Sequence, residues 1–546
     1  AQVLFSAGFP LVVPAGTFPG GSSVVFKLVA NKAGDASMYS AFSEVTVTIN
    51  APPASGVVNV DPPTGFALAT DISITAFGWT DDATDFPLSY EYSYKLIETQ
   101  SALTVQSKTT SNNVLTTLPA GLDSLDNVIL LFCEIYDLFD ASVTSSANVV
   151  VTAAVDLNVT AYMNAQLAAA QSSGNTDLLS QVVANTASTI NAVNCSLANS
   201  TYCAGLNRGS CYATAQRCSA CLDGYIGLAG DRNTMCRTST TELSVIGAAC
   251  TSNNDCESAL CSSNVCAVLP LECPSTTTTV CSGHGACGYT DANGKPYGRD
   301  CTIADVGCTA TCTCTDGYGG AACSLTATEL AGRSDTRSAL CGAVVSVGNS
   351  DDVSYVLLDS LISSLYSAYD PSEVVSAAGV LVCNQALTLL SEFAAAGYLS
   401  DESTSLIINL ASKFVQKSGA TTTGSRRRLA ESTIDSAVSG IIAGILTNMA
   451  DGEDPVAFAN EQMELSVYKS LSSNFTELSA SASSFLEVTK SAASAMQSST
   501  GYVQASALLW LQNPFPASDA LESPLFRVEV FGAEGSSRRR TQGADD

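Results

Sequence analysis

Cysteine is the residue type whose number and spacing in this sequence most clearly indicate chemistry. The 546 residues include 21 cysteines, and 18 of them lie between Cys195 and Cys323. A segment too short to bury a large core can be stabilised by disulfides instead. Such bonds persist in oxidising compartments and are rare in the cytosol. The pattern therefore predicts a string of small oxidised modules in an extracellular protein.

The cysteine spacing divides this block into three frameworks. A six-cysteine set spans 195–236 and comprises Cys195, Cys203, Cys211, Cys218, Cys221 and Cys236. A compact four-cysteine knot spans 250–266 and comprises Cys250, Cys256, Cys261 and Cys266. A second six-cysteine set spans 273–323 and comprises Cys273, Cys281, Cys287, Cys312, Cys314 and Cys323, with Cys301 and Cys308 expected as an extra pair inside it. Sequence alone leaves the connectivity within each set open.

The last framework carries the most specific motif of the chain. Cys281-Ser282-Gly283-His284-Gly285-Ala286-Cys287, followed by Cys312-Thr313-Cys314 and a Gly-Tyr-Gly-Gly turn before Cys323, resembles an EGF-like module. The 195–236 set has a similar Gly-Tyr-Ile-Gly turn and resembles the same module. For 273–323 the resemblance implies the pairs Cys273–Cys287, Cys281–Cys312 and Cys314–Cys323. Calcium-binding versions carry acidic residues just before the first cysteine, where this chain has Leu269-Pro270-Leu271-Glu272 and Asn191-Ala192-Val193-Asn194 instead, so no calcium is expected there.

Two cysteines outside the block are expected to bond each other. Cys341 and Cys383 both lie in a helical region, where a bond would tie two helices together. Cys133 is then the odd cysteine, expected on a strand, buried and unpaired.

The sequence offers little for catalysis or for a metal. His284 is the sole histidine and lies in a Gly-flanked turn, where a supported general base is not expected. Cys218-x₂-Cys221 together with His284 could suggest zinc, but an oxidising setting favours disulfides. Asp81, Asp82 and Asp85 could suggest calcium, although an acidic turn is the favoured interpretation. We therefore expect no enzyme, no cofactor and no bound metal.

Glycosylation sequons support an exported chain. They begin at Asn158, Asn194, Asn199 and Asn474, and the one at Asn194 is weaker because its middle residue is Cys195.

Charge and hydropathy exclude several partners. Lys and Arg number 23 against 51 Asp and Glu, a formal net charge of −28. Nucleic acids and anionic membranes select basic surfaces, so neither is expected as a partner. The longest apolar candidate, Val438–Leu446, is short of the ~18 residues a membrane helix needs. A membrane is therefore expected only through segments outside this chain. No signal-peptide pattern is visible at the start.

The first third of the chain alternates in the manner of strands. Residues 24–48 and 130–152 share a pattern of strand, Asp-Ala-Ser turn and closing strand, which indicates a repeated module. We expect a partial β-sandwich over 1–50 and a complete β-sandwich over 57–153, joined by a Pro-rich linker. Trp79 is expected in the core of the second sandwich.

Several short motifs of this region occur in a recognisable order. They are Ala51-Pro52-Pro53-Ala54-Ser55-Gly56, Pro63-Thr64-Gly65-Phe66, Gly78-Trp79-Thr80-Asp81-Asp82 and Pro87-Leu88-Ser89-Tyr90. Together they resemble the REJ (receptor for egg jelly) module of polycystin-type ectodomains and sperm receptors, over roughly residues 1–200. The resemblance implies fibronectin-III-like or Ig-like sandwiches in an extracellular, membrane-tethered recognition protein, without catalytic residues.

Helical periodicity dominates the rest of the chain. We expect a helical linker over 155–194, a helical bundle over 340–470 and the start of a β region over 500–546. Asp370-Pro371-Ser372-Glu373 is predicted to start one helix of the bundle, and Gly397 to end it. Arginine runs at 426–428 and 538–540 are predicted to lie in exposed loops. Helices followed by strands resemble the region before the autoproteolysis-inducing fold of polycystin-like receptors, but its His-Leu cleavage motif is absent.

The fold class predicted from these parts is multidomain: β-sandwich modules, a disulfide-rich EGF-like rod, a helical bundle and a C-terminal β region. The expected function is non-enzymatic extracellular recognition or adhesion within a larger, membrane-tethered protein, with protein or glycan ligands. The alternative is a structural surface-fibre or cell-wall glycoprotein that self-associates, as in flagellar hairs. Transmembrane helices in the full-length protein would favour the receptor.

Overall fold

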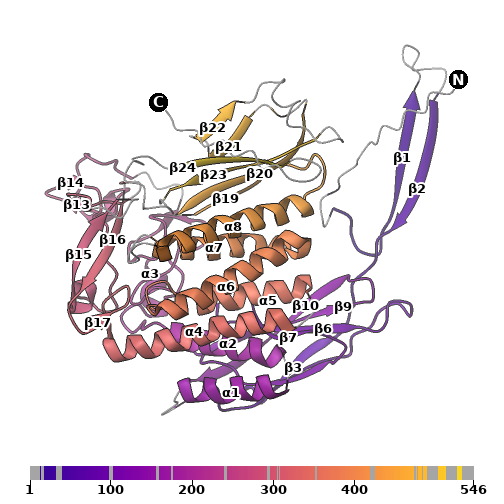
Figure 1. Cartoon of the computed structure of the whole chain (residues 1–546), viewed down its shortest axis with the longest axis horizontal. Helices are drawn as coiled ribbons and strands as arrows, with labels where there is room; N and C mark the ends of the chain where they lie inside the picture. Colours follow the sequence, from indigo (N-terminus) through magenta and orange to yellow (C-terminus); the bar gives the residue numbers. More distant parts are fainter. Residues whose placement is uncertain are drawn as a thin grey trace.

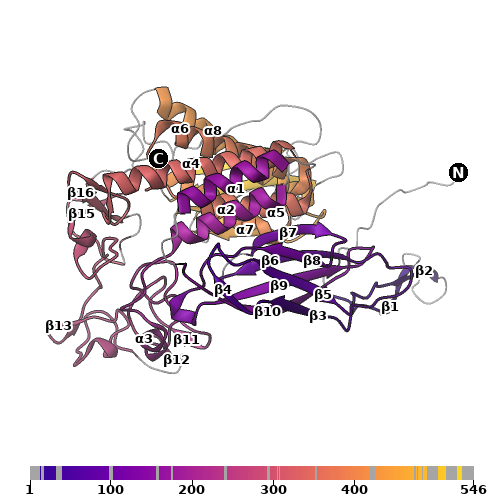
Figure 2. The same cartoon turned by 90° about the horizontal axis from the view of Figure 1, so that it is seen from below.

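The computed structural model shows a multidomain, strand-rich protein that also contains helices and many disulfides (Figures 1 and 2). The residues that the structure describes are 13, 17–31, 40–97, 102–154, 159–173, 176–238, 243–291, 296–303, 305, 308–350, 353–418, 425–460, 462–472, 475, 477–481, 484–487, 502–511 and 525–531.

An antiparallel ribbon opens the described part of the chain. It consists of β1 (Ser23–Asn31) and β2 (Ser40–Thr48), with Ser23 opposite Thr48. The ribbon stands away from the body of the protein (Figure 1). Within the described residues, the partial sandwich predicted for 1–50 therefore consists of this single hairpin, which cannot enclose a core by itself.

Two sheets follow and share one hydrophobic core. The first has the order β3-β5-β8 and the second the order β4-β10-β9-β6-β7, in which β10 pairs with β4 in parallel. Strict alternation on β9 buries Ile129, Leu131, Cys133 and Ile135 completely. This is the two-sheet arrangement predicted for 57–153. The strands are β3 (Val57–Asp61), β4 (Thr64–Phe66), β5 (Ile72–Phe77), β6 (Ser89–Lys95), β7 (Leu103–Thr109), β8 (Asn113–Thr116), β9 (Val128–Tyr136) and β10 (Ser142–Thr152).

Trp79 lies at the edge of this core and not in its centre, in contrast to the prediction. Its side chain is partly buried and packs against the core from the loop after β5. The indole lies over Gly56, where an added Cβ would come within 2.2 Å of the ring. The central positions that the prediction gave to Trp79 are filled by Tyr92 and Tyr94 of β6.

The two helices after the sandwich pack against the sandwich and against the later helices. The prediction of a helical linker over 155–194 is therefore incomplete. They are α1 (Val159–Ser173) and α2 (Thr176–Asn191). Leu179 and Val183 of α2 belong to the core of the later helices, whereas Ala184 belongs to the core of the sandwich. In Figure 2, α2 lies against the sheets, and it contacts both β7 and α4. A helix with apolar side chains on two faces is buried between two layers.

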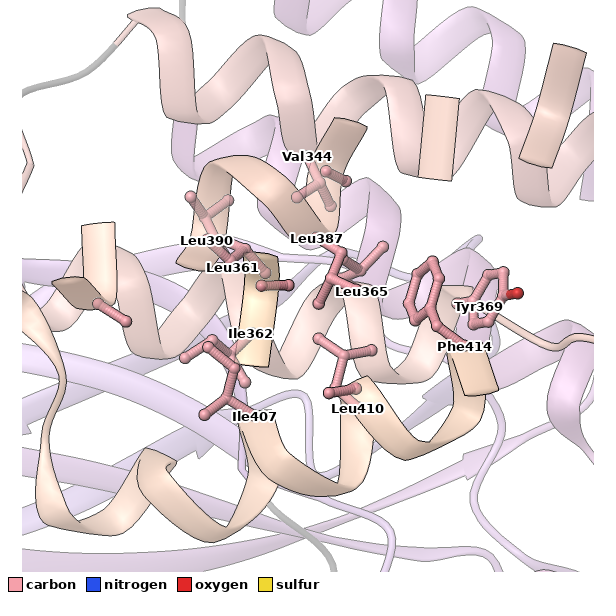
Figure 3. Close-up of a cluster of buried hydrophobic side chains, with 14 of the residues drawn as sticks. Val344, Leu361, Ile362, Leu365, Tyr369, Leu387, Leu390, Ile407, Leu410 and Phe414 are labelled. Carbon is pink, nitrogen blue, oxygen red and sulfur yellow. The ribbon is translucent and has the colours of Figure 1, made fainter. Parts of the chain in front are cut away.

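The helical unit begins and ends earlier than the predicted 340–470. It consists of α4 (Ala327–Ser350), α5 (Tyr355–Ala368), α6 (Ala377–Phe393), the π-helical turn η4 (Ala394–Tyr398), α7 (Asp401–Ser418) and α8 (Ser425–Asn448). Leucine and isoleucine side chains of α5, α6 and α7 interdigitate, and Tyr369 stacks on Phe414 with ring centroids 3.8 Å apart (Figure 3). Gly397 takes a positive φ of 95° and ends the α6 region, as predicted.

Two predicted boundaries in this unit are wrong. Helix α6 begins at Ala377, where the Ser376 hydroxyl accepts from the Gly379 amide, and not at Pro371. Asp370 accepts instead from the Ser372 amide and hydroxyl in a turn, and Glu373 is held by two arginines. Arg426–Arg428 lie in the first turn of α8 and not in a loop. The 538–540 run lies outside the described residues.

Among the residues that the structure describes, one helical segment, Ala377–Tyr398, is long and apolar enough to cross a membrane. Its Leu387 and Leu390 are fully buried in the helical core, and its Cys383 is bonded to Cys341 of α4. These contacts are those of a core helix.

A four-stranded antiparallel sheet of order β19-β20-β23-β24 covers the helices (Figure 1). Trp510 of β23 and Leu465 of β20 are buried in the helical core. The strands predicted in the β region of 500–546 are present as β23 and β24, but β19 and β20 lie in the range predicted for the bundle. The strands are β19 (Val456–Ala459), β20 (Met463–Leu471), β23 (Tyr502–Trp510) and β24 (Leu525–Phe531), with a separate hairpin of β21 (Glu477–Ser481) and β22 (Ser484–Glu487).

Candidate recognition surface and its disulfide framework

All the cysteines of the central block are paired within their own frameworks. The six-cysteine sets pair first with third, second with fourth and fifth with sixth. The bonds are Cys195–Cys211, Cys203–Cys218, Cys221–Cys236, Cys250–Cys261, Cys256–Cys266, Cys273–Cys287, Cys281–Cys312, Cys301–Cys308 and Cys314–Cys323. For 273–323 these are the pairs that the EGF-like resemblance implied. Because Cys218 and Cys221 are both bonded, they cannot serve as thiolate ligands for zinc.

Short strands and helices hold these frameworks together. The elements are α3 (Ser200–Gly205), β11 (Tyr225–Ile226), β12 (Arg237–Thr238), β13 (Cys261–Ser262), β14 (Val265–Cys266), β15 (Gly285–Thr290), β16 (Thr309–Cys314), β17 (Tyr318–Gly319) and β18 (Leu325–Thr326). The longest pair, β15 with β16, places Cys287 opposite Cys312.

A buried arginine organises the first module, which sequence reasoning missed. Arg208 is 1% exposed, and its guanidinium donates to the backbone carbonyls of Ser219, Leu228 and Gly230. A further bond joins it to the Thr234 carbonyl. Burial lowers the pKa of Arg208. The first module has little apolar core, and the hydrogen bonds of Arg208 hold its loops together from within.

The two predictions for cysteines outside the central block agree with the structure. Cys341 of α4 and Cys383 of α6 are bonded, with their Cα atoms 4.9 Å apart. Cys133 is a free, fully buried thiol on β9, and burial raises its pKa to about 12. A thiol in that state is neither a nucleophile nor a metal ligand at neutral pH.

His284, the sole histidine, lies against an aromatic side chain. Its ring stacks on Tyr318, with centroids 3.8 Å apart and planes 6° apart. Within the described part of the chain, no carboxylate bonds either ring nitrogen, so the orienting third member of a triad is not supplied.

Buried polar contacts lock the sandwich to α2. The Tyr94 hydroxyl donates to Asn185 Oδ1 at 3.1 Å, and Asn185 Nδ2 donates to the Thr117 carbonyl at 2.7 Å. One turn earlier, the Thr116 hydroxyl donates to Gln181 Oε1 at 2.9 Å. Directional bonds between buried groups fix the relative orientation of the two parts.

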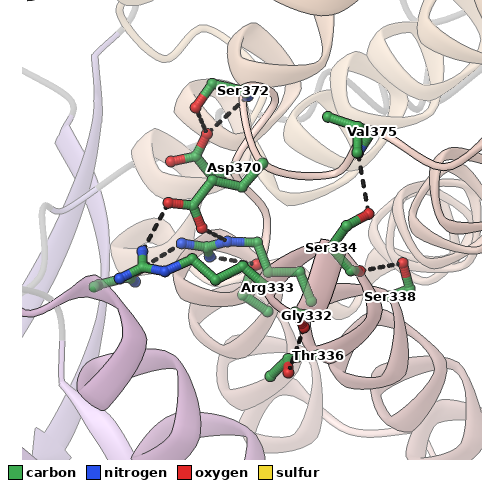
Figure 4. Close-up of polar contacts among 12 residues, drawn as sticks. Gly332, Arg333, Ser334, Thr336, Ser338, Asp370, Ser372 and Val375 are labelled. Atoms are coloured by element: carbon green, nitrogen blue, oxygen red, sulfur yellow. Dashed lines mark hydrogen bonds and ion pairs between the residues drawn. The ribbon is translucent and has the colours of Figure 1, made fainter. Parts of the chain in front are cut away.

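The end of α2 is fastened in turn to the helical unit. Arg337 of α4, 1% exposed, donates to Asn191 Oδ1 at 2.7 Å, to Glu373 Oε2 at 2.6 Å and to the Ala368 carbonyl at 2.8 Å. Arg333, one turn away, pairs with the other oxygen of Glu373 at 2.7 Å. Figure 4 shows Arg333 with the neighbouring Asp370–Ser372 turn. The sandwich, α2 and the helices therefore form one connected support.

The ribbon that this support carries has one strongly apolar face. The pairs Val24–Val47 and Phe26–Val45 place four apolar side chains on the same side of the ribbon, beside Leu28. Leu28 is 67% exposed and Val45 57% exposed. The opposite face mixes Val25, Val29 and Phe42 with an ion pair between Lys27 and Glu44. We refer to Val24, Phe26, Leu28, Val45 and Val47 as the apolar ribbon face.

A partly buried carboxylate pair lies on the larger sheet of the sandwich. Glu91 of β6 is directly opposite Glu134 of β9. Burial, and then repulsion by Glu134, raises the pKa of Glu91 to about 7, although the Tyr136 hydroxyl donates to it at 3.2 Å.

Two of the sequon asparagines can be placed. Asn194 and Asn199 are exposed, and each side-chain oxygen accepts a nearby backbone amide, from Ser196 and Tyr202 respectively. Asn158 and Asn474 lie outside the described residues.

The fold and frameworks define a multidomain, disulfide-rich chain in which a β-sandwich carries an exposed ribbon. Residues 5–194 match the family model of the REJ domain, so this chain contains an REJ region. The match spans the ribbon, the sandwich, α1 and α2. It indicates a polycystin-like region, and together with the disulfides it is consistent with an extracellular or ectodomain location. No curated protein and no solved structure matches the chain.

Proposed function

We propose that this chain is a non-enzymatic recognition or adhesion segment of a larger extracellular, membrane-tethered protein. In this proposal the REJ region consists of fibronectin-III-like modules, and the frameworks at 195–236 and 273–323 are EGF-like spacers. The observation that carries the proposal is the apolar ribbon face within the REJ region, in which Leu28, Val45 and Val47 are exposed and Val24 and Phe26 are partly buried. Exposed apolar surface of this kind is typical of protein-binding sites.

The ribbon also offers two open strand edges. Among the described strands, β1 pairs only with β2, and each therefore presents backbone amides and carbonyls along its other side. Edges of this kind bind extended segments of a partner by strand addition. The ligand favoured by this surface is a protein segment that brings apolar side chains and a strand, rather than a glycan.

Binding to cells that express the protein would test this function. Fluorescently labelled chain is added to such cells, and the bound amount is measured against concentration. We expect saturable binding that decreases at least tenfold in the double variant Leu28→Thr/Val45→Thr. The matched control Val25→Thr/Val29→Thr makes the same kind of change on the opposite face and should bind as the unmodified chain does. Equal binding by both variants would refute a role for the apolar ribbon face.

The same surface supports self-association into a fibre as a second candidate. A strand edge and an apolar face can pair with those of another copy and continue without closing. Sedimentation velocity separates the two functions: concentration-dependent polymers that disappear in Leu28→Thr/Val45→Thr favour the fibre, and a monomer that still binds cells favours recognition.

A further inference from the structure

Three carboxylates meet where the linker from the ribbon enters the sandwich. Asp81 and Asp85 lie in the loop between β5 and β6, and Asp137 lies in the turn between β9 and β10. One oxygen atom from each side chain lies within 4.8 Å of the other two. Asp85 is 5% exposed and Asp137 2% exposed, so two of the three carboxylates are almost completely buried. Residues at least 52 positions apart in sequence therefore form one acidic cluster, of which Asp81 is the partly exposed member.

The hydrogen bonds to this cluster come from neutral donors. Asp137 Oδ1 accepts from the amides of Phe139 and Ala141 at 2.8 and 3.0 Å, and its Oδ2 accepts from the side-chain amide of Asn50. Asp85 Oδ1 accepts from the Thr84 hydroxyl at 2.7 Å. In the described part of the chain, no lysine or arginine forms an ion pair with Asp81, Asp85 or Asp137.

A buried oxygen of the cluster has no partner among the described residues. Asp81 Oδ1 accepts from the Asp82 amide at 2.9 Å, whereas Asp81 Oδ2 is buried and has no hydrogen bond to the described residues. Burial of an unsatisfied polar atom is unfavourable, and the cost is larger for a charged group. A buried, unpartnered carboxylate oxygen beside two further buried carboxylates is an arrangement that a cation would stabilise.

We propose that Asp81, Asp85 and Asp137 bind one calcium ion. Calcium takes oxygen ligands at 2.3–2.6 Å, so oxygens that share one ion lie within about 5 Å of each other, as they do here. The ligand set contains oxygen only, which disfavours zinc. Calcium accepts irregular geometry and completes its shell with water or carbonyls, whereas magnesium demands a near-ideal octahedron that three carboxylates from two loops do not provide.

Calcium bound at this position would fix how the ribbon is attached to the sandwich. Asn50 lies two residues after the end of β2, and its side-chain amide donates a hydrogen bond to Asp137 at the cluster. A bound ion would hold the β5–β6 loop, the β9–β10 turn and, through Asn50, the linker in one arrangement. The ribbon would then be presented at a defined angle to the sandwich.

The test uses the full chain, stripped with EDTA and titrated with TbCl₃, which binds at calcium sites and emits when a nearby aromatic ring absorbs. Trp79, two residues before Asp81, is the expected sensitiser. We expect sensitised emission that CaCl₂ reverses, with calcium affinity in the range of about 10⁻⁴–10⁻³ M that is typical of extracellular modules. Asp81→Asn should weaken calcium binding at least tenfold. Asp82→Asn, an equal change of charge at an exposed neighbour, should leave it unaltered.

Thermal unfolding supplies a second readout that separates ligand loss from misfolding. With EDTA, Asp81→Asn should unfold at or above the temperature of the unmodified chain, because one of three like charges is removed. With 5 mM CaCl₂, the unmodified chain and Asp82→Asn should gain thermal stability while Asp81→Asn should not. The proposal is overturned if calcium changes neither emission nor unfolding, if the two variants respond alike, or if MgCl₂ displaces terbium as effectively as CaCl₂.

Discussion

Replacement of Glu91 by glutamine should stabilise the protein at high pH and have little effect at low pH. The pKa of Glu91 is raised from its ordinary value of 4.5 to about 7 by burial and then by Glu134. The folded state therefore holds this proton more tightly than the unfolded state does. Stability from this group is present below about pH 4.5 and is lost as the pH rises through 7. The difference corresponds to at most about 3 kcal/mol.

Glutamine is neutral at every pH and still accepts the hydrogen bond from the Tyr136 hydroxyl. We therefore expect Glu91→Gln to gain up to about 3 kcal/mol at pH 8 and to match the unmodified chain near pH 4.5. Unfolding by urea, followed at both pH values, measures this difference. Glu257→Gln, at an exposed glutamate, is the control and should show no such dependence. A Glu91→Gln effect of the same size at both pH values would refute the reasoning.

Three further predictions concern Cys133, the Cys341–Cys383 bond and the two arginines that bind Glu373. Cys133 should resist iodoacetamide in the native chain at pH 8 and react as one thiol per chain in guanidinium, as mass spectrometry would show; labelling before unfolding would contradict its burial. Replacing Cys341 and Cys383 by alanine should cost about 4 kcal/mol, since their bond closes a 42-residue loop, and an unchanged unfolding midpoint would count against this. Arg337→Met should cost about 3 kcal/mol because it breaks a buried ion pair, whereas Arg333→Met at the more exposed partner of Glu373 should cost about 1 kcal/mol or less; equal losses would contradict the assigned roles.

Local sequence patterns were sufficient to predict much of the fold. Alternation of apolar residues identified β9 because each strand residue points to a definite side of a sheet. The resemblance to an EGF-like module, which rests on the cysteine spacing and the Gly-Tyr turn, implied the pairs found in 273–323. The prediction that Gly397 ends its helix was correct as well, because glycine takes the positive φ of 95° found there at little cost.

Long-range partners account for the errors. Glu373 has the position of a capping residue, but two arginines from α4 compete for its carboxylate, and α6 begins later. Helix α2 could not be recognised as a two-sided layer because its second partner begins over a hundred residues later in the chain. The acidic cluster shows the same difficulty: Asp137 joins Asp81 and Asp85 only through the fold, whereas Asp82, adjacent in sequence, is exposed.

The most direct test of the recognition function is the affinity of the labelled chain for cells that express it, measured for the two ribbon variants side by side. The account predicts saturable binding of the unmodified chain, full binding by Val25→Thr/Val29→Thr and at least a tenfold loss for Leu28→Thr/Val45→Thr. Circular dichroism should show that both variants remain folded. An absence of saturable binding, or an equal affinity of the two variants, would contradict the account.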